Sequence, residues 1–258
     1  MLQKRVIPCL LLHKGGLYKT EKFKKPTYIG DPINAIKIFN EKEVDELIFL
    51  DIDATTQNKE PNYKMIEDIA SECFMPLCYG GGVKNIEQMK KIYALGVEKI
   101  SLSSAAVLNP KLIREAAKIF GNQSVIVTID VKKEFWGKKK VFINNGKKNT
   151  KIDPVEFVKK IESLGAGEIV VNSVDNDGVM KGYDTELLKE IKQNTKVPII
   201  ALGGAGNLNH IKEVFEIAKV DAVACGSMFV YQGPLKGVLI SYPPYQKVQE
   251  LSGSNDAD

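Results

Sequence analysis

Short apolar runs alternate with amphipathic stretches along most of the chain. Eight of these runs have the length and the residue types of buried strands. The predicted strands are Arg5–Leu12, Glu46–Asp51, Met75–Tyr79, Lys99–Leu102, Ser124–Asp130, Glu168–Ser173, Val197–Leu202 and Ala222–Cys225. Helical spacing marks the segments between them, namely Pro32–Lys42, Tyr63–Cys73, Ile86–Leu95, Pro110–Ile119, Pro154–Leu164, Thr185–Gln193 and Leu208–Lys219. Eight strands that alternate with helices predict the α/β class and a closed (β/α)8 TIM barrel.

An internal repeat divides the chain into two similar halves. Three motifs of the first half recur about 123 residues later in the second half. The pairs are Ile52-Asp53-Ala54 with Asn176-Asp177-Gly178, Tyr79–Asn85 with Leu202–Asn207, and Ser103–Val107 with Gly226–Val230. Three matches at one spacing predict a barrel with an internal two-fold half-barrel repeat.

Turn and capping residues mark several element boundaries. Asp31, Asn109 and Asp153 each precede a proline, which predicts a side-chain cap at three helix starts. The basic segment Lys132–Lys148 has the pattern of a hairpin, and Asn145-Gly146 in it predicts a turn.

The barrel is predicted to be one domain, residues 1–241. Pro243 and Pro244 lack the amide donor that a helix needs, so they interrupt what should be the last helix. Residues 242–258 are therefore predicted to be a C-terminal tail, with disorder at Ser252–Asp258.

Composition fits a globular protein with a sizeable core. Hydrophobic residues make up 44% and charged residues 26% of the 258 positions, and the formal charge is only +4. The lysines are scattered, so a solvated surface is favoured over nucleic-acid binding, although a mild positive field also suits an anionic substrate.

Membrane and metal functions are not favoured. The chain shows no secretory signal pattern and no apolar run of the roughly 20 residues that span a bilayer, so a cytoplasmic protein is expected. Four cysteines lie far apart without a CxxC pair, and only two histidines are present. Reduced core thiols are expected, with no metal and no cofactor.

Glycine-rich motifs follow strands three and seven of the predicted barrel. Gly80-Gly81-Gly82 and Gly203-Gly204 fall at the C-terminal ends of the strands, where barrel enzymes hold their active sites. Backbone amides exposed by glycine bind anions, and Ser103-Ser104 and Gly226-Ser227 add donors beside them. Alternatively, the glycines could be present only because the turns there are tight. Two such anion cradles at one repeat spacing predict a substrate with a phosphate at each end.

Asp130 ends the apolar fifth strand, where a general acid or base would be placed. It could instead cap a loop or pair with Lys132. Asp51 and Asp177 end strands two and six, where they could orient a ligand or loop amides.

These motifs carry a resemblance to a known family. They are Met1–Arg5, Phe49–Ile52, Gly80–Gly82, Gly146–Thr150, Gly182–Glu186 and Gly203–Gly206. The sequence resembles the cyclase subunit of imidazole glycerol phosphate synthase along nearly the whole chain to about Val230. In that family a glutaminase subunit delivers ammonia through the barrel to a substrate with two phosphates.

The resemblance assigns roles to individual positions. Phosphate contacts fall on Gly82, Ser103 and Ser104 in one half and on Asp177, Gly178, Gly204, Gly226 and Ser227 in the other. Lys19, in the loop after strand one, matches a substrate-binding lysine. Arg5, Glu46, Lys99 and Glu168 match an ammonia gate at the N-terminal mouth, although four charges there could also be an ordinary salt-bridged plug.

One departure bears on the activity. The family's second catalytic aspartate aligns with Leu11, which cannot transfer a proton, and the loss of such a group typically costs 10²–10⁴-fold. Ser103, Asn172 and Leu202 also replace an asparagine, a threonine and a serine. The pattern is similar to a paralogous branch found with surface-sugar biosynthesis enzymes.

Three functions stay open on the sequence. In the favoured hypothesis, the chain channels ammonia from its own glutaminase for acetamidino modification of a sugar, as the paralogous branch implies, and a separate ATP-using sugar amidotransferase completes the reaction. In the second, it is a working cyclase of histidine biosynthesis that makes imidazole glycerol phosphate. In the third, it is a scaffold that only docks and activates a glutaminase.

Overall fold

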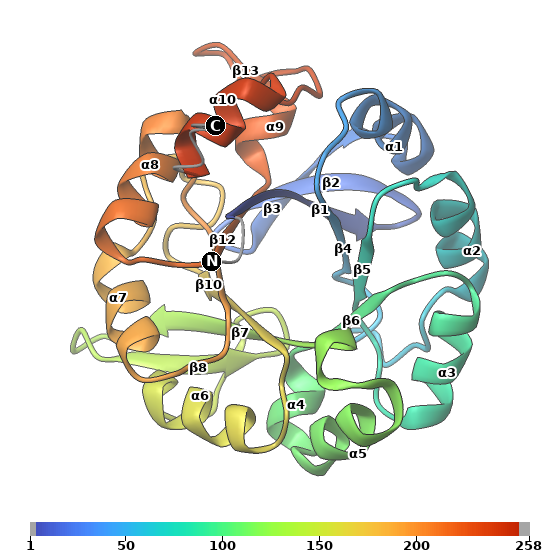
Figure 1. The fold of residues 1–258 in the computed structure, drawn as a ribbon, viewed down its shortest axis with the longest axis vertical. Coiled ribbons are helices and arrows are strands. Elements are labelled where there is room, and N and C mark those ends of the chain that lie inside the picture. The colour runs from blue at the N-terminus through green and yellow to red at the C-terminus, as the bar shows by residue number, and fades with distance from the viewer. Residues whose placement is uncertain (1–3, 253–258) are drawn as a thin grey trace, which may run out of the picture.

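The computed structural model describes residues 4–252, and these residues form a closed barrel surrounded by helices (Figure 1). Its eight parallel strands are β1 (Arg5–His13), β4 (Leu47–Asp51), β5 (Leu77–Gly80), β6 (Lys99–Leu102), β7 (Val125–Lys133), β10 (Glu168–Ser173), β11 (Ile199–Leu202) and β12 (Ala222–Cys225). Parallel pairing of β1 with β12 and of β10 with β7 closes the ring. The predicted (β/α)8 barrel is confirmed.

The helices cover the outside of the barrel. They are α1 (Pro32–Glu41), α2 (Tyr63–Glu72), α3 (Ile86–Ala94), α5 (Lys111–Phe120), α6 (Pro154–Ser163), α7 (Thr185–Gln193) and α8 (Leu208–Ile217). Short turns at α4 (Ser104–Leu108), η1 (Asn122–Ser124) and α9 (Ser227–Val230) complete the connections. Among the described residues, no helix combines the length and the apolar character that crossing a bilayer requires.

Two apolar layers hold the barrel together. The outer layer lies between strands and helices and contains the largest buried side chains, among them Phe39, Phe49, Phe157 and Phe215. A smaller inner cluster fills the space within the ring of strands. Outward and inward side chains alternate along each strand, which is why one strand serves both layers.

Local signals predicted most helix starts. The Asp31 and Asp153 side chains accept hydrogen bonds from first-turn amides of α1 and α6, as expected. Asn109 does not follow the prediction. Helix α5 begins at Lys111, and Asn109 ends the preceding α4, where its N–H donates to the Ala105 carbonyl. The sequence analysis did not predict α4, and Asn109 caps the end of that helix instead of the start of α5.

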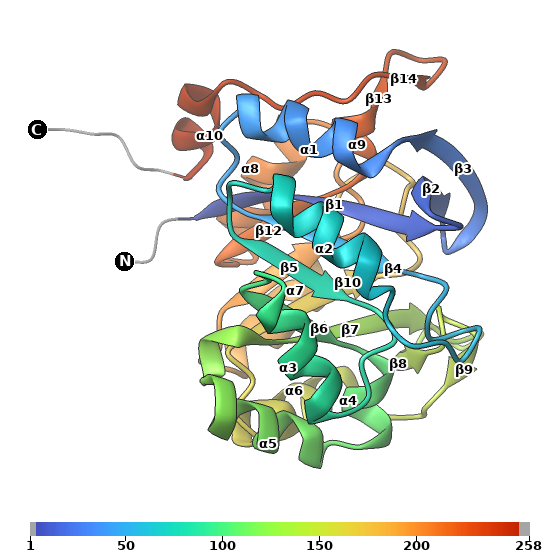
Figure 2. The same cartoon turned by 90° about the vertical axis from the view of Figure 1, so that its right-hand side faces the viewer.

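Three hairpins extend from the C-terminal end of the barrel (Figure 2). They are β2 (Gly16–Glu21) with β3 (Lys24–Gly30), β8 (Lys139–Ile143) with β9 (Lys148–Asn149), and β13 (Tyr231–Gln232) with β14 (Gly237–Val238). The turn predicted at Asn145-Gly146 joins β8 to β9, and both residues have positive φ. The hairpins therefore crowd the face on which the candidate site lies.

The segment after residue 241 packs on the barrel. Tyr242 is buried, and its hydroxyl donates to the Val6 carbonyl at 2.7 Å. The two prolines precede α10 (Tyr245–Ser252) and so do not interrupt it, while Val248 is buried against the core. A proline is compatible with a helix start because the first amides have no partner within the helix. The packed chain thus extends beyond the predicted boundary at 241. Of the disorder predicted for Ser252–Asp258, Ser252 instead ends α10, and 253–258 lie outside the described residues.

Candidate functional site

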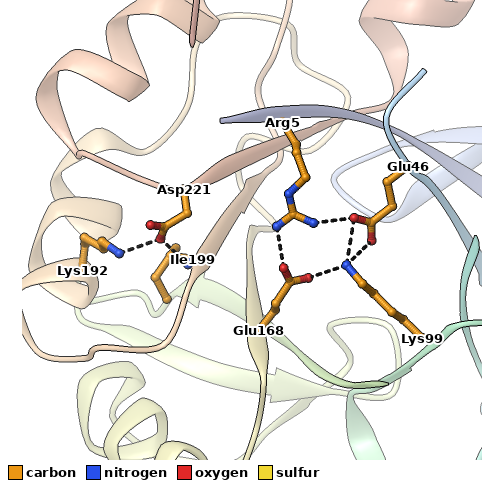
Figure 3. A network of polar contacts seen from close by, with 7 residues as sticks. All are labelled: Arg5, Glu46, Lys99, Glu168, Lys192, Ile199 and Asp221. Atoms are coloured by element: carbon orange, nitrogen blue, oxygen red, sulfur yellow. Dashed lines mark hydrogen bonds and ion pairs between the residues drawn. The ribbon is translucent and has the colours of Figure 1, made fainter. Parts of the chain in front are cut away.

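Four charged side chains form a ring at the N-terminal mouth of the barrel (Figure 3). Arg5 donates to both Glu46 and Glu168, and the Lys99 ammonium contacts the same two carboxylates at 2.9–3.0 Å. The Glu46 side chain is only 2% exposed, and the other three are between 13% and 23% exposed. Two acids and two bases thus balance their charges in a closed ring across the barrel axis.

An apolar lumen lies inside the strands above this charged ring. Its members are Ile7, Cys9, Ile48, Cys78, Ile126, Val170, Ile200, Leu202, Ala222 and Ala224. Burial raises the pKa of the Cys9 thiol to about 11 and that of Cys78 well above its ordinary value, so both thiols are neutral. The side chains of this inner cluster therefore carry no charge.

A pocket of about 120 Å³ opens at the C-terminal end of the lumen. We call it the upper pocket. Its lining includes Leu11, Lys19, Thr20, Phe23, Leu50, Asp51, Gly80, Gly81, Gly82, Ser103, Ser104, Asp130, Asn145, Asn172, Asp177 and Leu202. Residues from both halves and from two hairpins meet here. Thr20, Phe23 and Asn145 were not expected from the sequence, because hairpin packing brings them in.

Asp130 is one of two buried carboxyls of the upper pocket, the other being Asp177. It lies within β7, which continues to Lys133 because β8 pairs with it. Asn172 donates to its Oδ1 at 3.0 Å and Ser103 to its Oδ2 at 3.4 Å, and within residues 4–252 no hydrogen bond or ion pair joins it to Lys132. Burial raises the pKa of Asp130 to about 7, and the charge of Asp177 adds to that rise. A carboxyl with this pKa can both donate and accept a proton near neutral pH.

Leu11 faces the same pocket from β1. It pairs in register with Leu50 of β4 and Tyr18 of β2, and it is half-buried. The wall that Leu11 and Leu50 form is apolar. Asp130 is therefore not matched by a second carboxyl at the end of strand β1.

The first predicted anion cradle, formed by Gly80–Gly82 with Ser103 and Ser104, lines the upper pocket. Gly81 has a φ of +122°, and a Cβ there would lie 2.4 Å from the Asp51 carbonyl oxygen, so only glycine fits. The Ser104 Oγ accepts a hydrogen bond from Asn144, which ties the β8–β9 hairpin to this cradle.

The second cradle, formed by Gly203, Gly204, Gly226 and Ser227, is not among the lining residues of the upper pocket. A Cβ on Gly226 would lie 1.9 Å from the Lys19 Nζ, so the ammonium itself covers that backbone. Gly204 is packed in the same way against the Gly182 carbonyl. The structure thus brings one predicted cradle to the pocket and places Lys19 over the other.

Asp177 and Gly178 hold the β2–β3 hairpin in place. Asp177 lies in the loop after β10, beyond the strand end where we expected it. Its side chain accepts from Thr20, and its carbonyl accepts from the Lys22 amide at 2.8 Å. Gly178 is packed against the Thr20 carbonyl. Both residues therefore contact the hairpin that carries Lys19.

Asp51 orders the loop after β4. Its Oδ1 accepts from the backbone amides of Asp53 and Ala54 at 2.8 and 3.0 Å. Burial raises the pKa of Asp51, and these two hydrogen bonds oppose that rise. No cluster of His, Cys, Asp and Glu suited to a metal ion occurs among residues 4–252.

Comparison with known proteins places this arrangement in a family. Residues 5–236 match the family model described as histidine biosynthesis protein. The chain belongs to this family. It is 54% identical over 248 residues to a Pseudomonas aeruginosa relative provisionally named imidazole glycerol phosphate synthase subunit hisF2, covering 96% of this chain and 99% of the relative.

Other members of the family also match this chain over most of its length. A Vibrio vulnificus relative provisionally named hisF3 is 53% identical over 253 residues, or 97% of each chain. The imidazole glycerol phosphate synthase subunit HisF of Clostridium botulinum is 42% identical over 236 residues, covering 90% of this chain and 92% of the relative. The predicted resemblance to that synthase subunit is confirmed at the level of the family.

Proposed function

We propose that this chain is the barrel subunit of a glutamine-dependent complex that works in the cytoplasm. A glutaminase subunit would bind the N-terminal rim and release ammonia, which would cross the charged ring and the apolar lumen to the upper pocket. The observation that carries this proposal is the coaxial order of a balanced charged ring, a neutral lumen and a pocket with a titratable carboxyl.

The lumen favours neutral ammonia over the ammonium ion. An ammonium ion would lose its hydration between apolar walls that offer no counter-charge, and that cost is large. Neutral ammonia avoids most of the cost. The chemistry of the lumen therefore favours a nucleophile that reaches the upper pocket already deprotonated.

The charged ring supplies a first prediction. Arg5→Ala should lower the amount of product formed per glutamine hydrolysed. Without Arg5, Glu46 and Glu168 lose the partner that they share, and the ring is no longer closed. Ammonium-salt-dependent product should not change, since bulk ammonia can enter from the C-terminal face. Both yields can be measured in the reconstituted complex.

A matched control lies on the same rim. Lys192 forms an ion pair with Asp221 at 2.6 Å beside the ring but outside it, and its exposure matches that of Arg5 (Figure 3). Lys192→Ala should leave the coupling between glutamine hydrolysis and product intact. Equal loss in both variants would contradict a specific role for the ring.

The rim around the ring also carries exposed apolar side chains. Phe74 is 84% exposed, Ile119 is 54% exposed and Ile217 is 46% exposed. All three lie where helices α2, α5 and α8 end, on the side at which the strands begin. The three helices are spread around the barrel (Figure 1), so Phe74, the most exposed of the three side chains, is the contact that we propose for the glutaminase.

Phe74→Asp should weaken binding of the glutaminase subunit by about tenfold or more, as for a buried aromatic anchor. Calorimetric titration of the two purified subunits measures the change. Leu235→Asp is the control, because Leu235 is 95% exposed in the β13–β14 hairpin on the opposite face. The proposed docking face is wrong if the two variants bind alike.

We infer further that the delivered ammonia serves acetamidino modification of a sugar. In that reaction nitrogen replaces the oxygen of an N-acetyl group, and the oxygen must first be activated as a leaving group. A separate ATP-using sugar amidotransferase would supply that step. Leu11 supports this reading, because it stands at the position of the family's second catalytic aspartate and cannot transfer a proton, and the sequence resembles the sugar-associated branch.

Deletion of the gene tests the sugar assignment. Surface glycans of the deletion strain should carry N-acetyl groups where the parent strain carries acetamidino groups, as mass spectrometry can show. Complementation by the wild-type gene should restore the modification. Normal acetamidino sugars in the deletion strain would contradict this part of the proposal.

A working cyclase is the second candidate. The pKa of Asp130, raised to about 7 by burial, favours it because that carboxyl is poised for acid–base chemistry. The candidate predicts that the purified chain, given an ammonium salt, converts the bis-phosphate substrate phosphoribulosyl-formimino-AICAR-phosphate into imidazole glycerol phosphate and AICAR.

A further inference from the structure

A second cavity, of about 180 Å³, lies beside the upper pocket, between the turn after β1 and the loop that leads from β4 to α2. Its lining includes His13 at the end of β1, Lys14 of the turn, Asp53 and Glu60 of the loop, and Tyr79 of β5. Asp51 lines both spaces, so the two spaces adjoin at this side chain. We call this space the side cavity.

Tyr79 gives the side cavity an unpartnered donor. The residue is 2% exposed, and its hydroxyl has no hydrogen-bond partner among residues 4–252. A buried hydroxyl without a partner has lost its hydrogen bonds to water, so such a group usually meets a ligand or a water. The hydroxyl is therefore available to a ligand in this cavity.

His13 and Asp53 form a fixed pair at the edge of the same cavity. The His13 Nδ1 donates to Asp53 Oδ1 at 2.7 Å, and the other carboxylate oxygen accepts the Lys14 amide at 2.8 Å. The edge of the Tyr18 ring packs against the imidazole at 4.7 Å between centroids. Within the described chain, Nε2 of His13 has no hydrogen-bond partner. The pair thus presents an oriented imidazole nitrogen.

The lining defines the chemical class of ligand. Asp51, Asp53 and Glu60 face only two lysines across the cavity, so an anion is disfavoured. A metal ion is also disfavoured, because no suitable ligand cluster is found among the described residues. Leu12, Ala54, Met65 and Ile66 form an apolar part of the wall. A sugar ring has both kinds of group, since its hydroxyls can bond to the polar rim of the cavity and its C–H groups can contact the apolar wall.

We propose that the side cavity is a binding site for a neutral polyhydroxylated ligand of the size of one sugar ring. The Tyr79 hydroxyl and His13 Nε2 would contact its hydroxyl groups, and the apolar wall would contact its C–H face. A volume of about 180 Å³ holds about a dozen water-sized groups, which is roughly the number of non-hydrogen atoms in a hexose. This site does not depend on the proposed ammonia route.

Titration of the full chain with methyl N-acetyl-β-glucosaminide, followed by NMR, tests the proposal. The sugar should shift the His13 imidazole resonances at millimolar concentration, whereas inorganic phosphate should not. Tyr79→Phe should weaken sugar binding by a factor of about 2–10, which is the expected effect of one hydrogen bond. The variant should fold, because the lost hydroxyl has no partner in the structure.

Tyr93→Phe is the control, since its hydroxyl donates to the Ser124 carbonyl and the residue does not line the side cavity. That variant should bind the sugar like the wild type. The proposal is overturned if the sugar leaves His13 unshifted, if both Tyr variants bind alike, or if phosphate competes for the His13 response. The first of these outcomes would mean that the cavity holds solvent only.

Discussion

Replacing Asp130 by asparagine is expected to lower ammonia-dependent product formation by about 10²- to 10⁴-fold. Asparagine keeps the shape and the bond from Asn172 but cannot exchange a proton. The wild-type carboxyl, with a pKa raised by burial to about 7, can act in either direction near neutral pH. A steady-state assay of the complex between pH 6 and pH 8 measures the loss.

The same substitution should stabilise the fold at high pH. Because the pKa of Asp130 is higher in the folded chain than its ordinary value of 3.8, stability falls as pH rises from about 4 through 7. Asparagine removes that cost, so at pH 8 the free energy of unfolding should rise by roughly 2–4 kcal/mol. At pH 4 the two proteins should unfold alike in urea.

These two measurements separate a chemical role from a structural one. If Asp130→Asn loses activity but is more stable than the wild type at pH 8, the Asp130 carboxyl serves the reaction and destabilises the fold. Lost activity with lowered stability would contradict that assignment. If product formation and glutaminase stimulation both survive in Asp130→Asn, the chain serves as a scaffold only.

Leu11→Asp is expected to raise ammonium-dependent turnover of the bis-phosphate substrate by about 10²- to 10⁴-fold over the wild type. The new carboxyl would face the upper pocket opposite Asp130, where β1 now presents an apolar side chain. Purified protein, an ammonium salt and the bis-phosphate are sufficient for the assay.

Leu11→Asn is the control for this gain. It has nearly the same shape as the aspartate variant but no acid–base group, so it should remain as slow as the wild type. Rapid turnover by the wild type would favour the cyclase of histidine biosynthesis and would contradict the inference drawn from Leu11. A folded Leu11→Asp without any gain would show that Leu11 is not the deciding departure.

Much of the fold and part of the site could be predicted because the signals are local. Strands such as Lys99–Leu102 and Glu168–Ser173 begin and end as predicted, since burial on both faces requires an apolar run of that length. Resemblance to the family indicated the positions of the charged ring, and the starts of the parallel strands place Arg5, Glu46, Lys99 and Glu168 at one mouth of the barrel.

Other features were decided only by packing between distant segments. The repeat predicts two equivalent cradles, but the β2–β3 hairpin crosses to Asp177 and lays Lys19 over Gly226, so one cradle lines the pocket and the other is covered. The side cavity unites His13, Asp53 and Tyr79 from three strands and loops, and the repeat motifs that contain Asp53 and Tyr79 did not indicate that they meet His13. The sequence alone thus determined the barrel and the positions of its strand ends, because periodicity and capping act over a few residues. Tertiary structure decided which strand ends are open to a ligand, because that depends on side chains brought in from other parts of the chain.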